Sequence, residues 1–371
     1  MNPGKNKRDY DCLVIGGGIV GLMTARELLH AGLQVALLEK GSTGMESSWA
    51  GGGILSPLYP WHDSVLLEGL VDHSLHLYPH IVEELHTETG VDPEWQKSGM
   101  LVFAIDNEEE GQLRTWAGTR EIPVQVMYSE QLSIFEPALC TGFDRAFNLP
   151  EVCQIRNPYL LKAMYRFLVG HGVDIHEQTE VQRLDIKNNC IQAVNTTQGD
   201  FRADIIVLAN GAWGSGLLEE LAIRPVRGQM ICFRTTPGYL KHILLKDGLY
   251  IIPRRDGHIL VGSTVEDVGF NKSTTTAARD KLITGVQELL PGIGGFPLVG
   301  HWAGLRPATQ TSNPYICRHP AINDLYLNIG HYRNGLLLAP ASAAILTDII
   351  LGRETVPFAG NFRFQSVAHV C

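Results

Sequence analysis

The sequence predicts a mixed α/β fold of two lobes, in which a parallel-sheet domain is interleaved with a domain built on an antiparallel sheet. Three observations support this prediction. An apolar run at 11–15 leads into a glycine cluster and then a helix-forming stretch, which is the order of a β-α-β unit. A second buried run of parallel-sheet type follows at 204–208. From Val226 onward the strands alternate and carry aromatic residues, with a hairpin turn at Asp256-Gly257.

The glycine cluster has the spacing of a dinucleotide-binding turn. Gly16, Gly18 and Gly21 follow the first apolar run, and Glu39 ends the next one roughly 20 residues later. Gly16 allows a tight turn, Gly18 lets the backbone approach a pyrophosphate, and Gly21 lets helix and strand pack closely. Glu39 would accept hydrogen bonds from an adenosine ribose. The motif predicts a Rossmann-like domain, but by itself it does not separate FAD from NAD.

Composition excludes several classes of protein. A chain of 371 residues with 44% hydrophobic residues is long enough for two buried cores. The net charge of −9 and the lack of a basic block argue against a nucleic-acid binder. Seven cysteines without CxxC or zinc spacing fit a reducing compartment. The apolar stretch 336–351 is too short to span a bilayer, and no signal peptide is evident, so we expect a cytoplasmic protein without a membrane partner.

Periodicity and turn signals predict the remaining elements. Helices are expected at 72–89, 130–136, 158–171 and 336–351. Strands are expected at 35–38, 100–104, 173–177, 229–234, 250–253, 258–262 and 325–329, with a small antiparallel meander over 181–202. Because nucleotide-domain segments recur along the chain, we expect that domain to comprise 8–90, 150–225 and 310–355. The second domain would comprise 91–149 and 226–309, followed by a C-terminal tail, 356–371.

Four segments, taken together and in order, resemble the FAD-dependent amine and D-amino-acid oxidase superfamily. They are the glycine motif with Glu39, the stretch Ser47 to Ile54, the stretch Ala303 to Pro307, and the stretch Gly330 to Gly335. The likeness extends over 10–352, nearly the whole chain. It implies a two-lobed flavoprotein with non-covalent FAD between the lobes. It also implies oxidation of a small amino acid by O2, which gives an imine and hydrogen peroxide.

Within that superfamily, the chain is most similar to the branch that oxidises glycine. The resemblance implies activity on glycine, sarcosine and small D-amino acids, by hydride transfer to flavin N5. The imine would be hydrolysed to a 2-oxo acid and ammonia, or used to build the thiazole of thiamine. Members of this branch are homo-oligomers, so a dimer or tetramer is expected.

The resemblance also assigns FAD-binding residues. The amides of Ile19 and Val20 would meet the pyrophosphate at the helix start. Glu39 and Lys40 would bracket the ribose, and the Val181 backbone would read adenine. The turn at Gly211, after the second buried strand, could meet the cofactor again. The stretch along the pyrophosphate and isoalloxazine is Ser47, Ser48, Gly52, Gly53 and Ile54. The stretch against the pyrimidine edge is His331, Tyr332, Arg333, Asn334, Gly335, Leu336 and Leu337, where a helix N-terminus would stabilise the reduced, anionic ring.

Two arginines are candidates for the substrate carboxylate, because a planar guanidinium can hold a carboxylate with two hydrogen bonds. The resemblance gives Arg333 the main role and Arg306 a supporting one, with Tyr250 as a further hydrogen-bond donor. Gly248 and Val265 are expected to help set the size of the pocket. No acid–base residue is required, because the neutral amine reacts and the α-hydrogen leaves as hydride.

Several alternatives remain open. In monomeric sarcosine oxidases a Cys-x-Tyr arrangement carries flavin covalently, but here Cys317 follows Tyr315, so non-covalent FAD is expected. His73, His76 and His80 are interrupted by a proline and lack a carboxylate, so no metal site is predicted. The chain could also be a D-amino-acid or other small-amine oxidase, or an FAD dehydrogenase that passes electrons to a partner. A NAD-linked dehydrogenase would leave the C-terminal motif unexplained.

Overall fold

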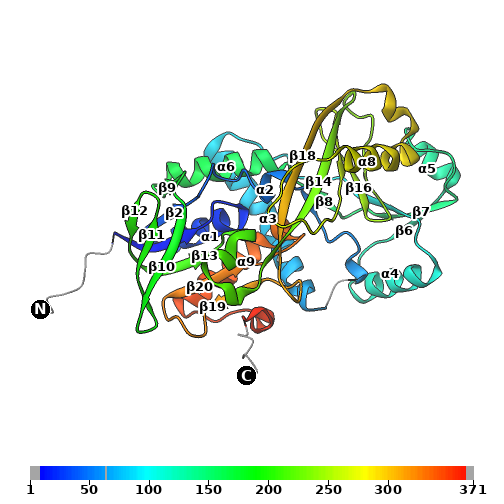
Figure 1. Cartoon of the computed structure of the whole chain (residues 1–371). Helices are drawn as coiled ribbons and strands as arrows, with labels where there is room; N and C mark the ends of the chain where they lie inside the picture. The colour runs from blue at the N-terminus through cyan, green and yellow to red at the C-terminus, as the bar shows by residue number, and fades with distance from the viewer. Residues whose placement is uncertain (1–8, 63–64, 365–371) are drawn as a thin grey trace, which may run out of the picture.

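A computed structural model describes residues 9–62 and 65–364 and contains two large sheets with helices around them (Figure 1). The first sheet has six strands. Their order is β19 (Tyr315–Arg318), β20 (Leu325–Ile329), β13 (Ala203–Leu208), β1 (Tyr10–Ile15), β2 (Val35–Leu38) and β9 (Asp174–His176). All neighbours are parallel except β19 and β20. This is the nucleotide-type sheet that the glycine motif predicts.

Side chains that alternate along β1 enter two separate cores. Cys12 and Val14 pack toward four helices: α1 (Ile19–His30), α3 (Val65–Thr89), α6 (Asn157–Gly170) and α9 (Gly335–Leu351). Leu13 and Ile15 pack toward the meander of β10 (Val181–Lys187), β11 (Cys190–Thr196) and β12 (Gly199–Phe201). Because both faces are covered, the strand is apolar throughout its last four residues.

The second sheet has eight strands and is antiparallel except where β15 meets β5. Its order is β18 (Leu298–Ala308), β14 (Arg224–Arg234), β17 (His258–Gly262), β16 (Leu249–Pro253), β15 (Ile243–Lys246), β5 (Met100–Phe103), β7 (Arg145–Leu149) and β6 (Gln125–Tyr128). Helix α8 (Thr276–Leu289) packs on it through Leu282, Val286 and Leu289. Helix α5 (Ser129–Phe135) joins the same core through Leu132, whereas α4 (Asn107–Thr119) packs into a different core of this domain through Leu113.

Short elements connect the two large sheets. A small sheet joins β3 (Ile54–Leu55), β8 (Cys153–Gln154) and β4 (Gln96–Lys97). Helices α2 (Ser47–Ala50) and α7 (Gly214–Leu217) and the 3₁₀ turns η1 (Pro60–His62), η2 (Gly211–Trp213), η3 (Glu219–Leu221) and η4 (Pro291–Gly295) lie in the connections. A last 3₁₀ turn, η5 (Pro357–Phe362), packs on α3 through Phe358 beside Gly69. Residues 365–371 of the predicted tail lie outside the described residues.

The predicted fold class is confirmed, but several elements differ in extent. Helix α3 begins at Val65 rather than at 72, and β14 begins at Arg224. Strand β18 and helices α4 and α8 were not predicted as elements. The acidic run 108–110 is the first turn of α4, where the Asp106 side chain accepts hydrogen bonds from the Glu108 and Glu109 amides. Strand β18 contains Gly300, Gly304 and Pro307, which weaken a strand pattern.

Strand β18 extends from the antiparallel sheet into the nucleotide-binding lobe. Its last residue, Ala308, forms an antiparallel bridge with His331, and the Tyr332 N–H donates to the Pro307 carbonyl at 3.0 Å. The turn before α9 is therefore attached to the other sheet. No helix within the described ranges is both long and apolar enough to cross a membrane.

Candidate active site

A cavity of about 930 Å³ lies between the two large sheets and is lined from both. Its walls include every residue that the sequence predicts to bind FAD or the substrate carboxylate, with one exception. From the first half of the chain these are Gly16, Gly18, Ile19, Val20, Glu39, Lys40, Ser47, Ser48, Gly52, Gly53, Ile54 and Val181. From the second half they are Gly211, Tyr250, Arg306, His331, Tyr332, Arg333, Asn334, Gly335, Leu336 and Leu337. The exception is Gly21. The fold therefore brings these residues together, while their individual roles remain predictions.

The glycine turn is closed too tightly for side chains. A Cβ on Gly16 would lie 2.5 Å from the Ala209 carbonyl oxygen, and the φ of Gly16 is +113°. A Cβ on Gly21 would lie 1.9 Å from the Gly16 carbonyl oxygen. Gly21 is thus behind the cavity wall because it fills the contact between helix and turn, which is the packing role that its spacing indicates.

The start of α1 is partly capped by another segment. The Ile19 N–H donates to Ser48 Oγ at 2.9 Å, and Asn157 Nδ2 in turn donates to the Ser48 carbonyl at 2.8 Å. The first hydrogen bond of the helix runs from the Leu22 N–H to the Gly18 carbonyl, so the Val20 amide has no partner within the helix. Ser48 therefore occupies the Ile19 amide that we expected to face a pyrophosphate.

Glu39 and Lys40 follow β2 and line the cavity near the glycine turn. Glu39 is 7% exposed, and its carboxylate accepts hydrogen bonds from the Gly17 and Gly41 amides at 2.7 and 2.8 Å. A carboxylate has further lone pairs, so these bonds orient Glu39 without saturating it. Lys40 Nζ lies 3.2 Å from the centroid of the Trp213 ring, and burial lowers the pKa of Lys40.

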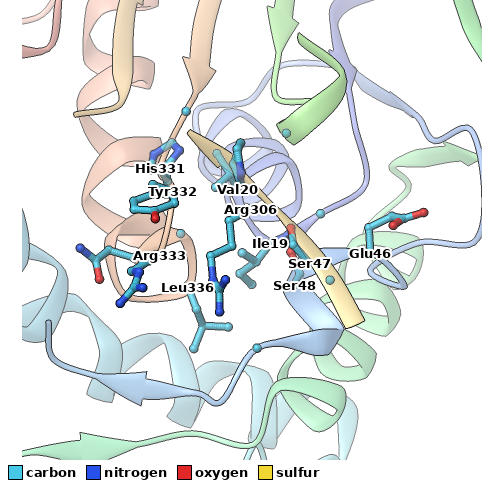
Figure 2. Close-up of a pocket in the computed structure, with 18 of the residues that line it drawn as sticks. Ile19, Val20, Glu46, Ser47, Ser48, Arg306, His331, Tyr332, Arg333 and Leu336 are labelled. Carbon is cyan, nitrogen blue, oxygen red and sulfur yellow. Dashed lines mark hydrogen bonds between the residues drawn. The ribbon is translucent and has the colours of Figure 1, made fainter. Parts of the chain in front are cut away.

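The two arginines differ in how firmly they are held. The Arg306 guanidinium donates to Ser263 Oγ and, at 3.2 Å, to the Thr264 carbonyl; a Cβ on Gly228 would lie 2.2 Å from it. Arg333 is exposed, and within the described ranges its guanidinium has no hydrogen bond or ion pair, only a contact of 5.7 Å with the Tyr332 ring. Figure 2 shows both arginines in the same part of the cavity.

Tyr250 projects from β16 into the same cavity and is 8% exposed. Its hydroxyl donates to Met230 Sδ at 3.7 Å, a weak hydrogen bond. The ring fits between two glycines, because a Cβ on Gly52 or Gly262 would lie 3.1 or 2.8 Å from it. The Tyr250 hydroxyl can therefore change to a stronger acceptor at little cost.

His331 lies in the turn before α9 and is 3% exposed. Its Nε2 lies 3.0 Å from Ser342 Oγ, and the Ser342 hydroxyl donates to the Leu338 carbonyl at 2.8 Å. Because the hydroxyl hydrogen is engaged there, His331 Nε2 must be the donor. Burial lowers the pKa of His331 to about 3, so the imidazole is neutral at ordinary pH.

Two expectations about the pocket are wrong, and several wall residues were missed. Gly248 and Val265 do not line the cavity: Gly248 lies in the turn before β16 and donates to the Tyr59 hydroxyl, and Val265 is 52% exposed. A turn residue and a residue beyond β17 are not on the face that bears Tyr250. The missed wall residues include Tyr59, Asn157, Met230, Ser263 and Asn328. No local motif marks them, because packing between segments far apart in the sequence brings them to the cavity.

Similarity to known proteins identifies the family of this chain. Residues 11–349 match the family described as "FAD dependent oxidoreductase". The chain belongs to this family. It is 42% identical to the glycine oxidase of Pseudomonas aeruginosa over 93% of this chain and 95% of that protein. It is also similar to the crystal structure of the glycine oxidase of Geobacillus kaustophilus, with a TM-score of 0.91, 29% identity and 97% and 99% of the two chains covered.

One group of relatives is longer than this chain. The bifunctional protein ThiO/ThiG of Trichormus variabilis is 31% identical over 96% of this chain, but the match covers 56% of that protein.

As a member of this FAD-dependent family, the chain should offer a site that suits FAD, and the cavity does. Its volume is at the upper end for small-molecule sites, about 300–1,000 Å³. Residues 16–18 are all glycine, so the turn itself presents only backbone at the start of α1, and the Val20 amide there has no partner within the helix, as a pyrophosphate site requires. Asn157, Asn210 and Asn328 line the cavity, and the buried Oδ1 atom of each has no hydrogen-bond partner among the described residues. They suit a ligand rich in hydroxyl and N–H donors, and FAD has both.

Proposed function

We propose that this chain is an amino-acid oxidase that converts glycine, O2 and water to glyoxylate, ammonia and hydrogen peroxide. The observation that carries the proposal is the placement of Arg306, Arg333 and Tyr250 together in the cavity that the glycine turn and the N-terminus of α9 also line. The 42% identical relative is named glycine oxidase. A carboxylate-binding group beside a flavin site is the arrangement that oxidation at an α-carbon requires.

In this proposal the arginines hold the substrate carboxylate. Arg306 is already oriented by Ser263 and the Thr264 carbonyl, so it binds with little loss of side-chain entropy. Arg333 has unused donors and completes the clamp. The firmer hold on Arg306 supports giving it a larger share of the carboxylate binding than the resemblance implies. The Tyr250 hydroxyl leaves Met230 Sδ and donates to the same carboxylate. Three donors then fix the α-carbon in one orientation.

The remaining groups supply electrostatics rather than proton transfer. Bound FAD supplies the acceptor for the two electrons and the α-hydrogen. The free amides at the start of α9 (Gly335–Leu351) stabilise negative charge beside them. His331 is neutral and bonded to Ser342, so it contributes no positive charge and takes no proton from the substrate. The amine must therefore lose its proton to solvent before it reacts.

The same site would accept sarcosine and small D-amino acids, because the groups in the clamp bind only the carboxylate. The relatives named ThiO/ThiG support the further proposal that the imine product is used to build the thiazole of thiamine. A homo-oligomeric assembly, a cytoplasmic location and the domain boundaries given above remain predictions.

Anaerobic reduction of the flavin tests the proposal directly. The purified protein is mixed with glycine without oxygen, and the flavin absorbance at about 450 nm is followed. We expect bleaching, then recovery with release of peroxide when air is admitted. Bleaching without recovery would identify a dehydrogenase that needs an electron-accepting partner. A flavin that glycine, sarcosine and D-alanine all leave oxidised would overturn the proposal while leaving the family assignment intact.

A further inference from the structure

Among the described residues, the buried guanidinium of Arg254 has no hydrogen bond or ion pair with a carboxylate. Arg254 follows β16 directly and is 6% exposed. All its side-chain acceptors are neutral: Nη1 donates to Gln154 Oε1 at 2.8 Å and to the Ile155 carbonyl at 3.0 Å, and Nη2 donates to the Gly52 carbonyl at 2.7 Å. Burial lowers the pKa of Arg254 to about 10. Burying a charge with only neutral partners costs folding free energy, which indicates that the contacts of Arg254 serve a purpose other than stability.

The contact with Gly52 leads to the cavity wall. Gly51, Gly52, Gly53 and Ile54 line the cavity, whereas Arg254 lies behind them and does not. Gly53 has a φ of +76°, and a Cβ there would lie 2.1 Å from the Ile155 carbonyl oxygen and 3.2 Å from Arg254 Nη2. Residues 51–53 of this segment are thus backbone without side chains, packed against their neighbours, and the Arg254 side chain is one of those neighbours.

Strand β16 brings the same segment against Tyr250. Residues two apart on a strand share a face, so Tyr250 and Ile252 point to the same side. A Cβ on Gly52 would lie 2.6 Å from Ile252 Cδ1 and 3.1 Å from the Tyr250 ring. Arg254 continues this series, since its side chain reaches the Gly52 carbonyl. Tyr250 and Ile252 on this side of β16, and Arg254 just after it, therefore all lie against one glycine of the cavity wall.

We propose that Arg254 is a positioning residue, which fixes the segment 51–54 against β16 and so sets the spacing between the cofactor wall and Tyr250. Two hydrogen-bonding nitrogens of one planar group hold the Gly52 and Ile155 carbonyls at a fixed distance. A neutral side chain of similar length would leave both carbonyls without this donor. The inference rests on the proposed function only in taking segment 51–54 as the wall beside the flavin.

The test replaces Arg254 by methionine and by lysine and uses Arg255 as the matched control. Arg255 is the next residue, lies 46% exposed at its side chain and pairs with Asp92, so Arg255→Met removes a neighbouring charge without touching segment 51–54. The FAD dissociation constant is measured by fluorescence titration of apoprotein, and the bound flavin is examined by visible circular dichroism. Neither readout needs substrate, so both remain valid if glycine is not oxidised.

We expect Arg254→Met to raise the FAD dissociation constant by about tenfold or more and to change the visible dichroism. Arg254→Lys keeps the charge but offers only one nitrogen, so its FAD dissociation constant should lie between those of Arg254→Met and wild type. Arg255→Met should match wild type. With FAD saturating, Arg254→Lys should raise the KM for glycine, because Tyr250 is no longer held at a fixed distance from segment 51–54. The change in kcat should be smaller.

Unchanged FAD binding in the Arg254 variants would overturn the inference. If Arg254→Met lowers the melting temperature but binds FAD with unchanged affinity and dichroism, Arg254 is a structural residue and the inference is overturned. If Arg254→Met is insoluble, Arg254→Lys decides in the same way: wild-type affinity, dichroism and KM would reject the role. Failure of wild type to oxidise glycine would instead count against the proposed function.

Discussion

The backbone N–H of Tyr332 donates to the carbonyl oxygen of Pro307 at 3.0 Å, and this bond joins the two arginines of the candidate active site. Arg306 directly precedes Pro307, and Arg333 directly follows Tyr332. The first belongs to the edge strand of the antiparallel sheet, and the second to the turn before α9. The proposed clamp is therefore built where the two lobes meet, and its geometry depends on both.

Loss of either arginine should impair substrate binding more than FAD binding. We expect Arg306→Met and Arg333→Ala each to lower kcat/KM for glycine by about 30-fold or more, since removing one partner of a charge pair costs about 2–5 kcal/mol. Both proteins should stay yellow. Steady-state kinetics with glycine and the visible spectrum check this. The exposed Arg318→Met is the control, and an unchanged KM in Arg333→Ala would place the clamp elsewhere.

Gly21→Ala should disrupt the cofactor turn. Its Cβ would lie 1.9 Å from the Gly16 carbonyl oxygen, so either the helix or the turn must shift. We expect loss of most bound FAD and a lower melting temperature, measured by the ratio of flavin to protein absorbance and by thermal unfolding. Gly170→Ala is the matched control, since nothing lies within 4 Å of a Cβ at that helical position. It should keep its FAD and be at least as stable as wild type.

Tyr78→Phe should destabilise the start of α9. Pro340 has no N–H, so the Leu336 carbonyl lacks its helical donor, and the buried Tyr78 hydroxyl donates to it instead. Removing the hydroxyl leaves a buried carbonyl unsatisfied, and we expect a loss of about 1–3 kcal/mol in the free energy of unfolding, measured in urea. In a Pro340→Ala background, which restores the N–H, the same change should cost less. Equal losses in both backgrounds would refute this account.

His331 should make stability depend on pH. Burial lowers the pKa of the folded imidazole to about 3 from its ordinary value of about 6.5, so the unfolded chain takes up a proton first as pH falls. Stability is then lost progressively from about pH 6.5 toward pH 3, by up to about 1.4 kcal/mol per pH unit for this one group. Urea unfolding at several pH values should show a shallower slope for His331→Gln, whose amide can still donate to Ser342. A slope identical to wild type would show that other groups cause the loss.

Local patterns predicted a good part of the fold. The glycine spacing and the apolar runs identify β1, α1 and β2. These elements can be predicted because the tight turn and the two buried strands each require particular residues within a short stretch of sequence. The pattern failed at β18, where glycines and a proline interrupt the strand, and at α8, which is largely polar. These two elements are held by pairing with β14 and by packing on the sheet, and neither cause appears in a short window of sequence.

By itself, the sequence determined the nucleotide-binding turn, the order of the motifs and the residue types able to bind a carboxylate. The tertiary structure decided which residues meet. It placed Ser48 on the Ile19 amide, Met230 on the Tyr250 hydroxyl and Arg254 behind Gly52, and it kept Gly248 and Val265 out of the cavity. The physical reason is that these contacts join segments far apart in the chain, and their distances are set by strand register and core packing rather than by local spacing.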